Sequence, residues 1–320
     1  MMRISLLLLV ILPFVTVGQT DPELHEMPPK WRKGQSVEFT STAVVRMTVG
    51  DTLPINSTTR ANGTLKVMEK SSTGYIIKFS CEQQEPVSVD LDLGIEGDSV
   101  KLMVDSVMRT INSIASVYAD IPVQYLVSLE GEVLDVYEPQ KLRLAFENAT
   151  YTMMEKLLPD GDRIGFDKHR VDSLIDTRMS DFIQVAVNQM NVLFMGYLMV
   201  FPTSGTYREE MMFSDVQAPL MDNPEPIHGW LELKTVQATH EAIVGQVDYI
   251  YDPADFVKVF SKQGLASNID VEQISMRETR TFHYNLQSGW VSRIIEKIDF
   301  DIGAVKGYTT TTTELDLIVR

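Results

Sequence analysis

Five scattered histidines and two short charged runs are the residues of this 320-residue sequence best suited to acid and base chemistry. A zinc protease site needs two histidines four residues apart on one helix face, and His240-Glu241 has no second histidine at that spacing. His169 lies within the polar run 167–172, near the run 160–163, whose carboxylates could act with it as acid and base. A solvated connector explains these runs better, so we expect no catalytic residue, no metal site, no cofactor and no enzyme activity.

Two further features are expected to be structural. The acidic residues between positions 90 and 98 lack the central glycine and the terminal glutamate of a calcium-binding loop. The single cysteine, Cys81, falls on the apolar side of the alternating segment 75–82, which predicts a buried structural thiol rather than a reactive one. One cysteine allows no internal disulfide, so stability must come from the core.

The charge balance excludes nucleic acids as partners. The chain has 44 acidic and 28 basic residues, a formal net charge of −16 at pH 7. A nucleic-acid binding surface must be basic to displace the counterions of the phosphate backbone, and anionic membranes attract basic residues for the same reason. We therefore expect no nucleic-acid partner and little attraction to anionic membranes.

Residues 1–18 have the form of a cleavable signal peptide. Met1-Met2-Arg3 is a short basic start, residues 4–17 are an apolar run, and Val17-Gly18-Gln19 provides small residues for cleavage. The run is shorter than the roughly 20 residues of a membrane-spanning helix, so a retained anchor is the less favoured alternative. We expect a periplasmic or secreted mature protein without stable membrane insertion.

Period-two alternation of apolar and polar residues predicts β-strands over most of the chain. A hairpin is expected over residues 123–137, where a two-residue turn at Glu130-Gly131 would place Leu134 on the same face as Val127. A second tight turn is expected at Gln287-Ser288-Gly289, with Gly289 left-handed. The other predicted strands are 36–49, 63–68, 74–81, 87–93, 206–213, 229–239, 242–251, 271–286, 290–302 and 306–319.

Apolar residues spaced three and four positions apart predict three main helices, at about 101–118, 138–158 and 180–197. Pro139 lies in the first turn of the second helix, where proline is tolerated, and Pro159-Asp160-Gly161 ends that helix. A short helix is expected over residues 253–262.

Together these elements predict an α+β fold with a large, curved antiparallel sheet, like half of a barrel, and about three helices on one face. Residues 19–35 are expected to form an irregular N-terminal arm. Residues 36–320 then form a single α+β domain or, alternatively, two sheet lobes. The hairpins at 125–133 and 284–291 are similar, which leaves an internal duplication as an open alternative.

Methionine is frequent, with 17 residues, and many of them fall on the predicted helices. Unbranched thioether side chains fill irregular cores and also line adaptable apolar cavities. If a hydrophobic ligand is bound, we expect it between the helices and the sheet. The predicted ligand contacts are Met108, Ile111, Phe146, Met153, Met190 and Tyr197.

Two segments carry a resemblance to known proteins: Leu129-Glu130-Gly131-Glu132-Val133 with the helix after it, and Asn285-Leu286-Gln287-Ser288-Gly289-Trp290 with the closing strands. The chain resembles a family of uncharacterised exported β-rich proteins from gram-negative bacteria. In the order of its elements it is also similar to the periplasmic lipoprotein-carrier fold of the LolA and LppX kind. That likeness implies lipid or acyl-chain binding, and no ligand-binding residue is carried over from it.

The sequence therefore predicts an exported cell-envelope protein, not an enzyme, that binds or carries a hydrophobic ligand such as a lipid or a lipidated protein. The acidic surface favours a neutral lipid or a lipidated protein over an anionic phospholipid. The alternative is a structural or protein-interaction module at the cell envelope without a small-molecule ligand.

Overall fold

The computed structural model describes residues 24–49, 53–84, 88–91, 121–157, 168–213, 226–262, 274–302 and 305–318. In these residues the chain forms a large antiparallel sheet, a two-stranded sheet and three helices. The predicted signal peptide and the predicted helix at 101–118 lie outside the described residues.

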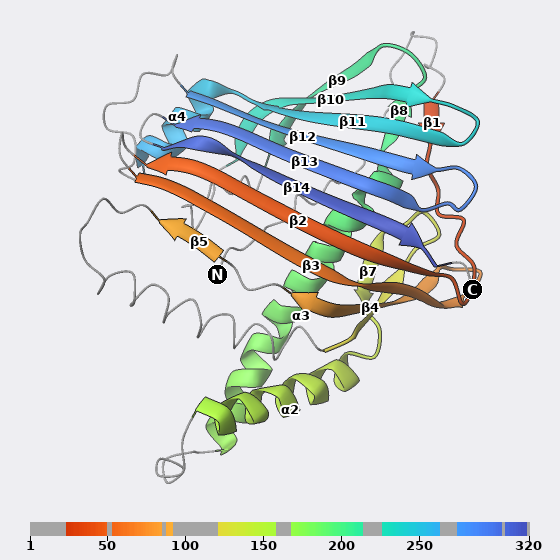
Figure 1. Cartoon of the computed structure of the whole chain (residues 1–320), viewed down its shortest axis with the longest axis vertical. Helices are drawn as coiled ribbons and strands as arrows, with labels where there is room; N and C mark the ends of the chain where they lie inside the picture. The colour runs from red at the N-terminus through yellow and green to blue at the C-terminus, as the bar shows by residue number, and fades with distance from the viewer. Residues whose placement is uncertain are drawn as a thin grey trace.

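The large sheet confirms the prediction of a sheet-dominated fold. Its strands are β2 (Ser36–Val49), β3 (Leu53–Lys70), β4 (Tyr75–Gln84), β5 (Ser88–Leu91), β6 (Val123–Val127), β7 (Val133–Val136), β9 (Thr206–Phe213), β10 (Ile227–Ala238), β11 (Ala242–Tyr251), β12 (Ile274–Asn285), β13 (Val291–Ile302) and β14 (Val305–Leu317). The order across the sheet is β7-β6-β4-β3-β2-β14-β13-β12-β11-β10-β9, with β5 paired to β3 (Figure 1). Apart from the pairings of β14 with β2 and β4 with β6, the neighbours along this path are consecutive strands, so most of the sheet is a meander.

The segment predicted as an irregular N-terminal arm, residues 19–35, contains one short strand in its described part. Its β1 strand (Leu24–Glu26) pairs antiparallel with β8 (Val200–Pro202). Further along the arm, Met27 and Trp31 are completely buried. This arm therefore contributes side chains to the core of the domain.

Three helices are described: α2 (Pro139–Leu157), α3 (Lys168–Leu198) and α4 (Pro253–Lys262). α2 and α4 confirm the predicted helices at 138–158 and 253–262. Asp252 caps α4, because its side-chain Oδ1 accepts hydrogen bonds from the backbone N–H groups of Ala254 (2.8 Å) and Asp255 (3.2 Å). α3 is longer than predicted and begins at Lys168 instead of near Ser180.

α3 crosses the sheet on one side, which we call the inner face, and α2 projects beyond the sheet (Figure 1). α3 contacts β7 and β13, whereas α2 packs against α3. Their contact includes the rings of Phe146 and Phe182, whose centroids are 5.0 Å apart. We expected all the main helices to cover one face of the sheet; α2 instead forms a helical hairpin with the first half of α3.

An aromatic cluster fills one end of the inner face, where the N-terminal arm, α3 and β13 meet. Trp31 stacks on Trp290 with ring centroids 4.6 Å apart, and it also contacts the rings of Tyr75, Phe194 and Tyr197. Each of these aromatic residues is buried. The cluster therefore ties the arm, the long helix and both halves of the sheet together.

The hairpin of β6 and β7 corrects the predicted register. A bulge between Leu126 and Val127 pairs Val127 with Val133, so Val133 is buried while Leu134 is 56% exposed. The cause is a longer turn, in which the Ser128 hydroxyl accepts hydrogen bonds from the backbone N–H groups of Glu130 and Glu132. A two-residue turn cannot accommodate these bonds.

Two other local predictions had different outcomes. Gly289 has φ of +70°, which confirms the left-handed position in the turn after β12. Cys81 lies opposite Gly63 in the β3–β4 pairing, but it is half-buried where we expected a buried thiol.

Candidate functional site

The middle of the inner face is lined by small side chains. On β2, the buried Val37 and Phe39 mark the inner face, and the pairing of β2 with β3 and β14 extends it across three strands. We call the next three inward-facing positions of each strand the small-residue patch. Its members are Ser41, Ala43 and Val45 of β2, Ser57, Thr59 and Ala61 of β3, and Thr309, Thr311 and Thr313 of β14.

This patch differs from the packed core beside it. Thr313 is buried, and the other eight members are only half-buried. A sheet face packed against a helix is normally filled by large apolar side chains that interdigitate with the helix. Because these side chains are small, the layer of side chains that covers the sheet is thinner here than beside the patch.

A cluster of three charged residues borders the patch on β12 and β13, and we call it the ion cluster. In the sheet register, Thr311 lies beside Glu296, and Glu296 lies beside Arg280. Arg280 Nη2 is 2.9 Å from a carboxylate oxygen of Glu296 and 2.5 Å from one of Glu278. The three side chains are 11–16% exposed, so all three charges are largely withdrawn from water.

The other residues that contact the ion cluster provide hydrogen-bond partners for only some of its polar atoms. Met195 of α3 accepts at its Sδ from Arg280 Nη1 (3.1 Å) and from the Tyr249 hydroxyl (3.3 Å), although a thioether is a weak acceptor. The Tyr251 hydroxyl donates to Glu278 at 3.3 Å. Arg280 Nε is buried and has no hydrogen-bond acceptor among the described residues.

Close packing of α3 on the sheet holds Met195 in this position. A Cβ atom at Gly196 would lie only 2.7 Å from Cδ1 of Phe282 on β12. The absence of a side chain at Gly196 therefore allows the last turns of α3 to approach the sheet beside Arg280.

The ion cluster has an electrostatic imbalance, because two carboxylates share one guanidinium. Burial raises the pKa of Glu296 above its usual value, Arg280 opposes the rise, and the charge of Glu278 adds to it. Removing charges from water costs several kcal/mol per ion before pairing is counted. Buried charges with a perturbed pKa occur often at functional sites.

The opposite, outer face of the sheet carries a polar network in which both carboxylate oxygens of Asp248 have partners. Asp248 is only 1% exposed and accepts hydrogen bonds from Thr279 (2.6 Å) and Gln246 (2.9 Å). Lys234 and Arg277 lie 3.3 and 3.2 Å from its carboxylate oxygens. Burial alone would raise the pKa of Asp248, but these hydrogen bonds and charges lower it below the usual value. The network links β10, β11 and β12, and its role is structural.

We expect Asp248→Asn to lower the free energy of unfolding by about 1.5–3 kcal/mol at pH 7, because hydrogen bonds and ion pairs to a charged acceptor are lost. The folded-state pKa lies below the unfolded value of about 3.9, so the stabilisation is present above that value and is lost as the pH falls through the folded-state pKa. Urea titrations at pH 7 and pH 3 measure this dependence. A difference between variant and wild type that stays the same at both pH values would contradict it.

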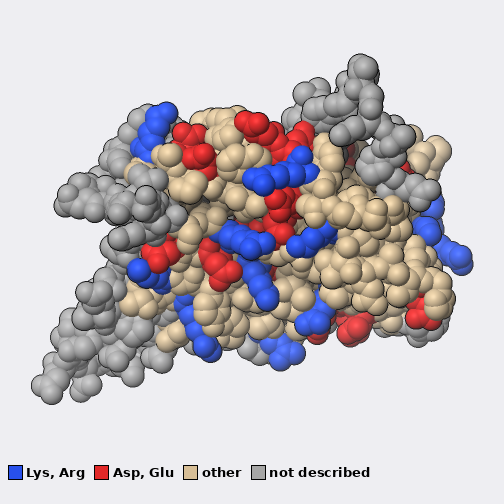
Figure 2. All heavy atoms as spheres, turned by 90° about the horizontal axis from the view of Figure 1, so that it is seen from above, with Lys and Arg blue, Asp and Glu red and all other residues tan. Residues whose placement is uncertain are grey.

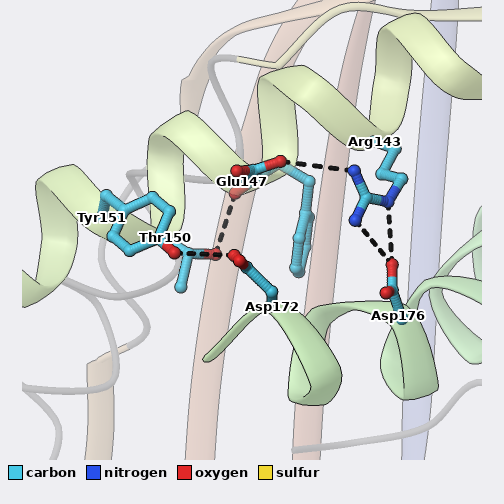
Figure 3. A network of polar contacts seen from close by, with 7 residues as sticks. Arg143, Glu147, Thr150, Tyr151, Asp172 and Asp176 are labelled. Carbon is cyan, nitrogen blue, oxygen red and sulfur yellow. Dashed lines mark hydrogen bonds and ion pairs between the residues drawn. The ribbon is translucent and has the colours of Figure 1, made fainter. Parts of the chain in front are cut away.

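The polar residues between α2 and α3 form a third network (Figure 3). Arg143 bridges Asp176 (2.7 Å) and Glu147 (3.3 Å), and the Tyr151 hydroxyl donates to Asp172 at 2.7 Å. The hydrogen bond to Asp172 raises the pKa of Tyr151 to about 12. These contacts explain why α3 starts early, since Asp172, which we expected in a solvated connector, pairs with α2.

The residues predicted to contact a ligand are not brought together at one site in the structure. Met108 and Ile111 lie outside the described residues, and Met153 lies in α2. Phe146 packs within the α2–α3 hairpin. In the described core, Met190 and Tyr197 of α3 are buried, and the Tyr197 hydroxyl accepts a hydrogen bond from Val291 N at 2.8 Å. A ligand role for these residues stays a prediction, whereas the small-residue patch and the ion cluster were missed.

A depression of about 570 Å³ opens at the end of the sheet, away from the small-residue patch. Lys30, Arg32 and Asp316 lie on its rim, and Trp290 and Leu315 lie deeper. Its charged side chains are on the surface and, apart from a long contact from Lys30 to the Leu286 carbonyl (3.4 Å), no contact organises them around a common point. We therefore favour the inner face as the candidate site.

Surface charge gives no sign of a polyanion site on the face seen in Figure 2. Basic and acidic side chains alternate there over the described residues. Opposite charges are also paired in the described residues, as in Arg208–Glu232 and Lys306–Asp301. No group of three or more potential metal ligands occurs in the described residues. Among the described helices, none is both long and apolar enough to cross a membrane.

Comparisons with known proteins show no family for the chain. No family model matches it, and no curated protein matches it either. A structure concerned with lipid–protein interactions in lipovitellin is 7% identical, with a TM-score of 0.40, and covers 91% of this chain. The match spans only 26% of the lipovitellin chain.

The β domain of the Bordetella autotransporter BrkA is also 7% identical, with a TM-score of 0.23; the match covers 89% of this chain and all of that domain. Neither protein is a lipoprotein carrier of the LolA or LppX kind. Both scores are below 0.5, so the function is argued from the geometry of the inner face.

Proposed function

We propose that the protein is an exported binding protein that holds an amphipathic ligand on the inner face of its sheet, with the ligand's apolar chain over the small-residue patch. The observation that carries this proposal is the half-buried patch itself. Eight of its nine members keep partial exposure, whereas the inner positions beyond one end of the patch on the same strands, Val37, Phe39 and Leu65, are buried. Small side chains bordered by larger ones leave room for an alkyl chain, so the buried side chains beside the patch do not have to move when it binds.

The border of the patch fits a ligand with one polar end. Toward the far end of the strands, Met47, Ile298 and Phe300 provide apolar surface on β2 and β13. Toward β12, the ion cluster supplies buried charge, and the patch hydroxyls lie between these two regions. This gradient from apolar to charged surface supports an amphipathic ligand over a purely hydrocarbon one.

The alternative, an interaction module that pairs through a sheet edge, has weaker support. β9 is an edge strand in the described part of the sheet, and Arg208, Glu209 and Glu210 lie consecutively along it. Charged side chains on an edge strand oppose the addition of another strand. At the other edge, the Val133 N–H of β7 already donates to Asn191 of α3 at 3.1 Å.

Filling the patch tests the proposal. We expect Thr311→Trp to weaken binding of a fluorescent monoacylglycerol by about tenfold or more, which corresponds to about 1.4 kcal/mol, because the indole occupies the space of the alkyl chain. Thr312→Trp is the matched control, since Thr312 is the same residue type on the outer face of the same strand. Fluorescence titration measures both variants.

The control variant should bind within about twofold of wild type. Equal binding by the two variants would contradict the location of the site, and a wild type that takes up no probe would contradict the function. Far-ultraviolet circular dichroism of both variants reports whether the sheet is retained.

A further inference from the structure

We propose that the polar end of the ligand is a cation, an alkylammonium group that Glu296 binds at the border of the small-residue patch. This inference rests on the proposed function and adds the chemical class of the head group. Three observations support it. They are the charges of the ion cluster, the contact of both carboxylates with the same guanidinium nitrogen of Arg280, and the register of β13 with β14.

The charge of the cluster favours a cation. Glu278 and Glu296 together carry two negative charges, and Arg280 supplies one positive charge. The described neighbours that touch the cluster, Met195, Tyr249 and Tyr251, are neutral. An ammonium group brings the cluster to neutrality, whereas a carboxylate or phosphate would add a further negative charge where Coulomb energies are large.

The geometry leaves Glu296 available. Arg280 reaches both carboxylates through the same atom, Nη2, so each carboxylate keeps unused acceptor capacity. Glu278 also accepts from Tyr251, while the single contact described for Glu296 is that to Arg280. Glu296 is also the most exposed of the three side chains, at 16%.

The sheet register gives the ligand its path. Glu296 pairs with Thr311, Thr311 with Ala43, and Ala43 with Thr59, so a straight row of inner positions leads from the carboxylate across the patch. Four adjacent strands at about 4.8 Å spacing give this row a length of roughly 14 Å, close to that of an extended dodecyl chain. An ammonium at Glu296 therefore places its alkyl chain along the row.

The Arg280 nitrogens that contact no carboxylate, Nη1 and Nε, do not make an anionic head group more favourable than a cationic one. Arg280 Nη1 points to Met195 of α3, and Nε is buried among described residues that offer no acceptor. An anionic head group would have to displace Met195, which the close contact of Gly196 with Phe282 holds in place. Glu296 faces the patch side of the cluster and requires no such displacement.

Three dodecyl probes that differ only in the head group test the inference: dodecylamine, dodecanol and dodecanoic acid, titrated calorimetrically at pH 7 into the full protein. We expect the amine to bind about tenfold or more tightly than the alcohol, and the acid more weakly than the alcohol. Glu296→Gln should bring the affinity for the amine down to that for the alcohol and leave the affinity for the alcohol unchanged.

Asp299→Asn is the matched control, because it removes one negative charge from the outer face of the same strand. It should retain the preference for the amine, which separates local binding from general attraction to an acidic protein. If the acid binds as tightly as the amine, or if Glu296→Gln keeps the preference, the inference is wrong while the binding function stands. If none of the three probes binds, the proposed function fails.

Discussion

Replacing Arg280 with methionine is expected to lower the free energy of unfolding by about 3–5 kcal/mol at pH 7, because the variant leaves the carboxylates of Glu278 and Glu296 buried without a cation. Methionine keeps an unbranched side chain in the position, so lost packing contributes little. Urea denaturation followed by circular dichroism measures the change.

The deficit of the Arg280→Met variant should depend on pH. Without the guanidinium to oppose it, burial raises the folded-state pKa of Glu296 further above the unfolded value of about 4.3. The folded variant then binds protons more readily than the unfolded chain, so its stability rises as the pH falls from 7 to 5. A deficit that is equal at both pH values would contradict this explanation.

Arg293→Met provides the control. Arg293 pairs with Glu314 on the outer face at 3.5 Å, and both side chains are about half exposed (46% and 55%). Exposed ion pairs contribute at most about 1 kcal/mol, so this variant should be nearly as stable as wild type. A large loss in the control would show that arginine removal destabilises the sheet at either face.

Trp31→Ala is expected to cost about 3–5 kcal/mol of stability, because it removes the central ring of the aromatic cluster. Trp31 has no exposed surface and contacts four other aromatic rings, so the cavity cannot easily collapse. The loss should appear both in urea denaturation and as a weaker near-ultraviolet circular dichroism signal. Leu24→Ala on the same arm is the control, since Leu24 is 51% exposed. An arm that contributes nothing to the fold would give two variants of equal stability.

Local sequence patterns predicted many elements closely. β9, β11 and α4 begin and end at the predicted residues. β9 follows the turn residues Ser204-Gly205, and β11 is followed by Asp252-Pro253, which also caps and opens α4. Where tertiary contacts decide, the predictions were less accurate. The start of α3 depends on bonds to α2, and the position of Leu134 depends on the hydrogen bonds of Ser128.

The candidate site was harder to predict, because its parts are distant in the sequence. The patch joins β2 and β3 to β14, and their pairing is set by the whole sheet. The five threonines at 309–313 have no alternation in polarity of their own, so only the continuation of the Leu315 and Leu317 pattern indicates that Thr309, Thr311 and Thr313 face inward. Another signal was available: Glu278, Arg280, Phe282 and Tyr284 alternate along β12, which places two charged residues on the same face as two aromatic ones.

The pairing of β14 with β2 has a consequence for the order of folding. β2 to β7 and β9 to β14 are each built mainly from neighbours in the chain, so each half of the sheet can form from local contacts. The seam between them joins residues separated by most of the chain length, as Val37 and Leu317 are. Closing so long a loop is slow compared with hairpin formation. The edge of β2 that pairs with β14 therefore has no partner until β14 has been synthesised, so a chain that emerges from its N-terminus joins the two halves of the sheet only after the strands between them have been made.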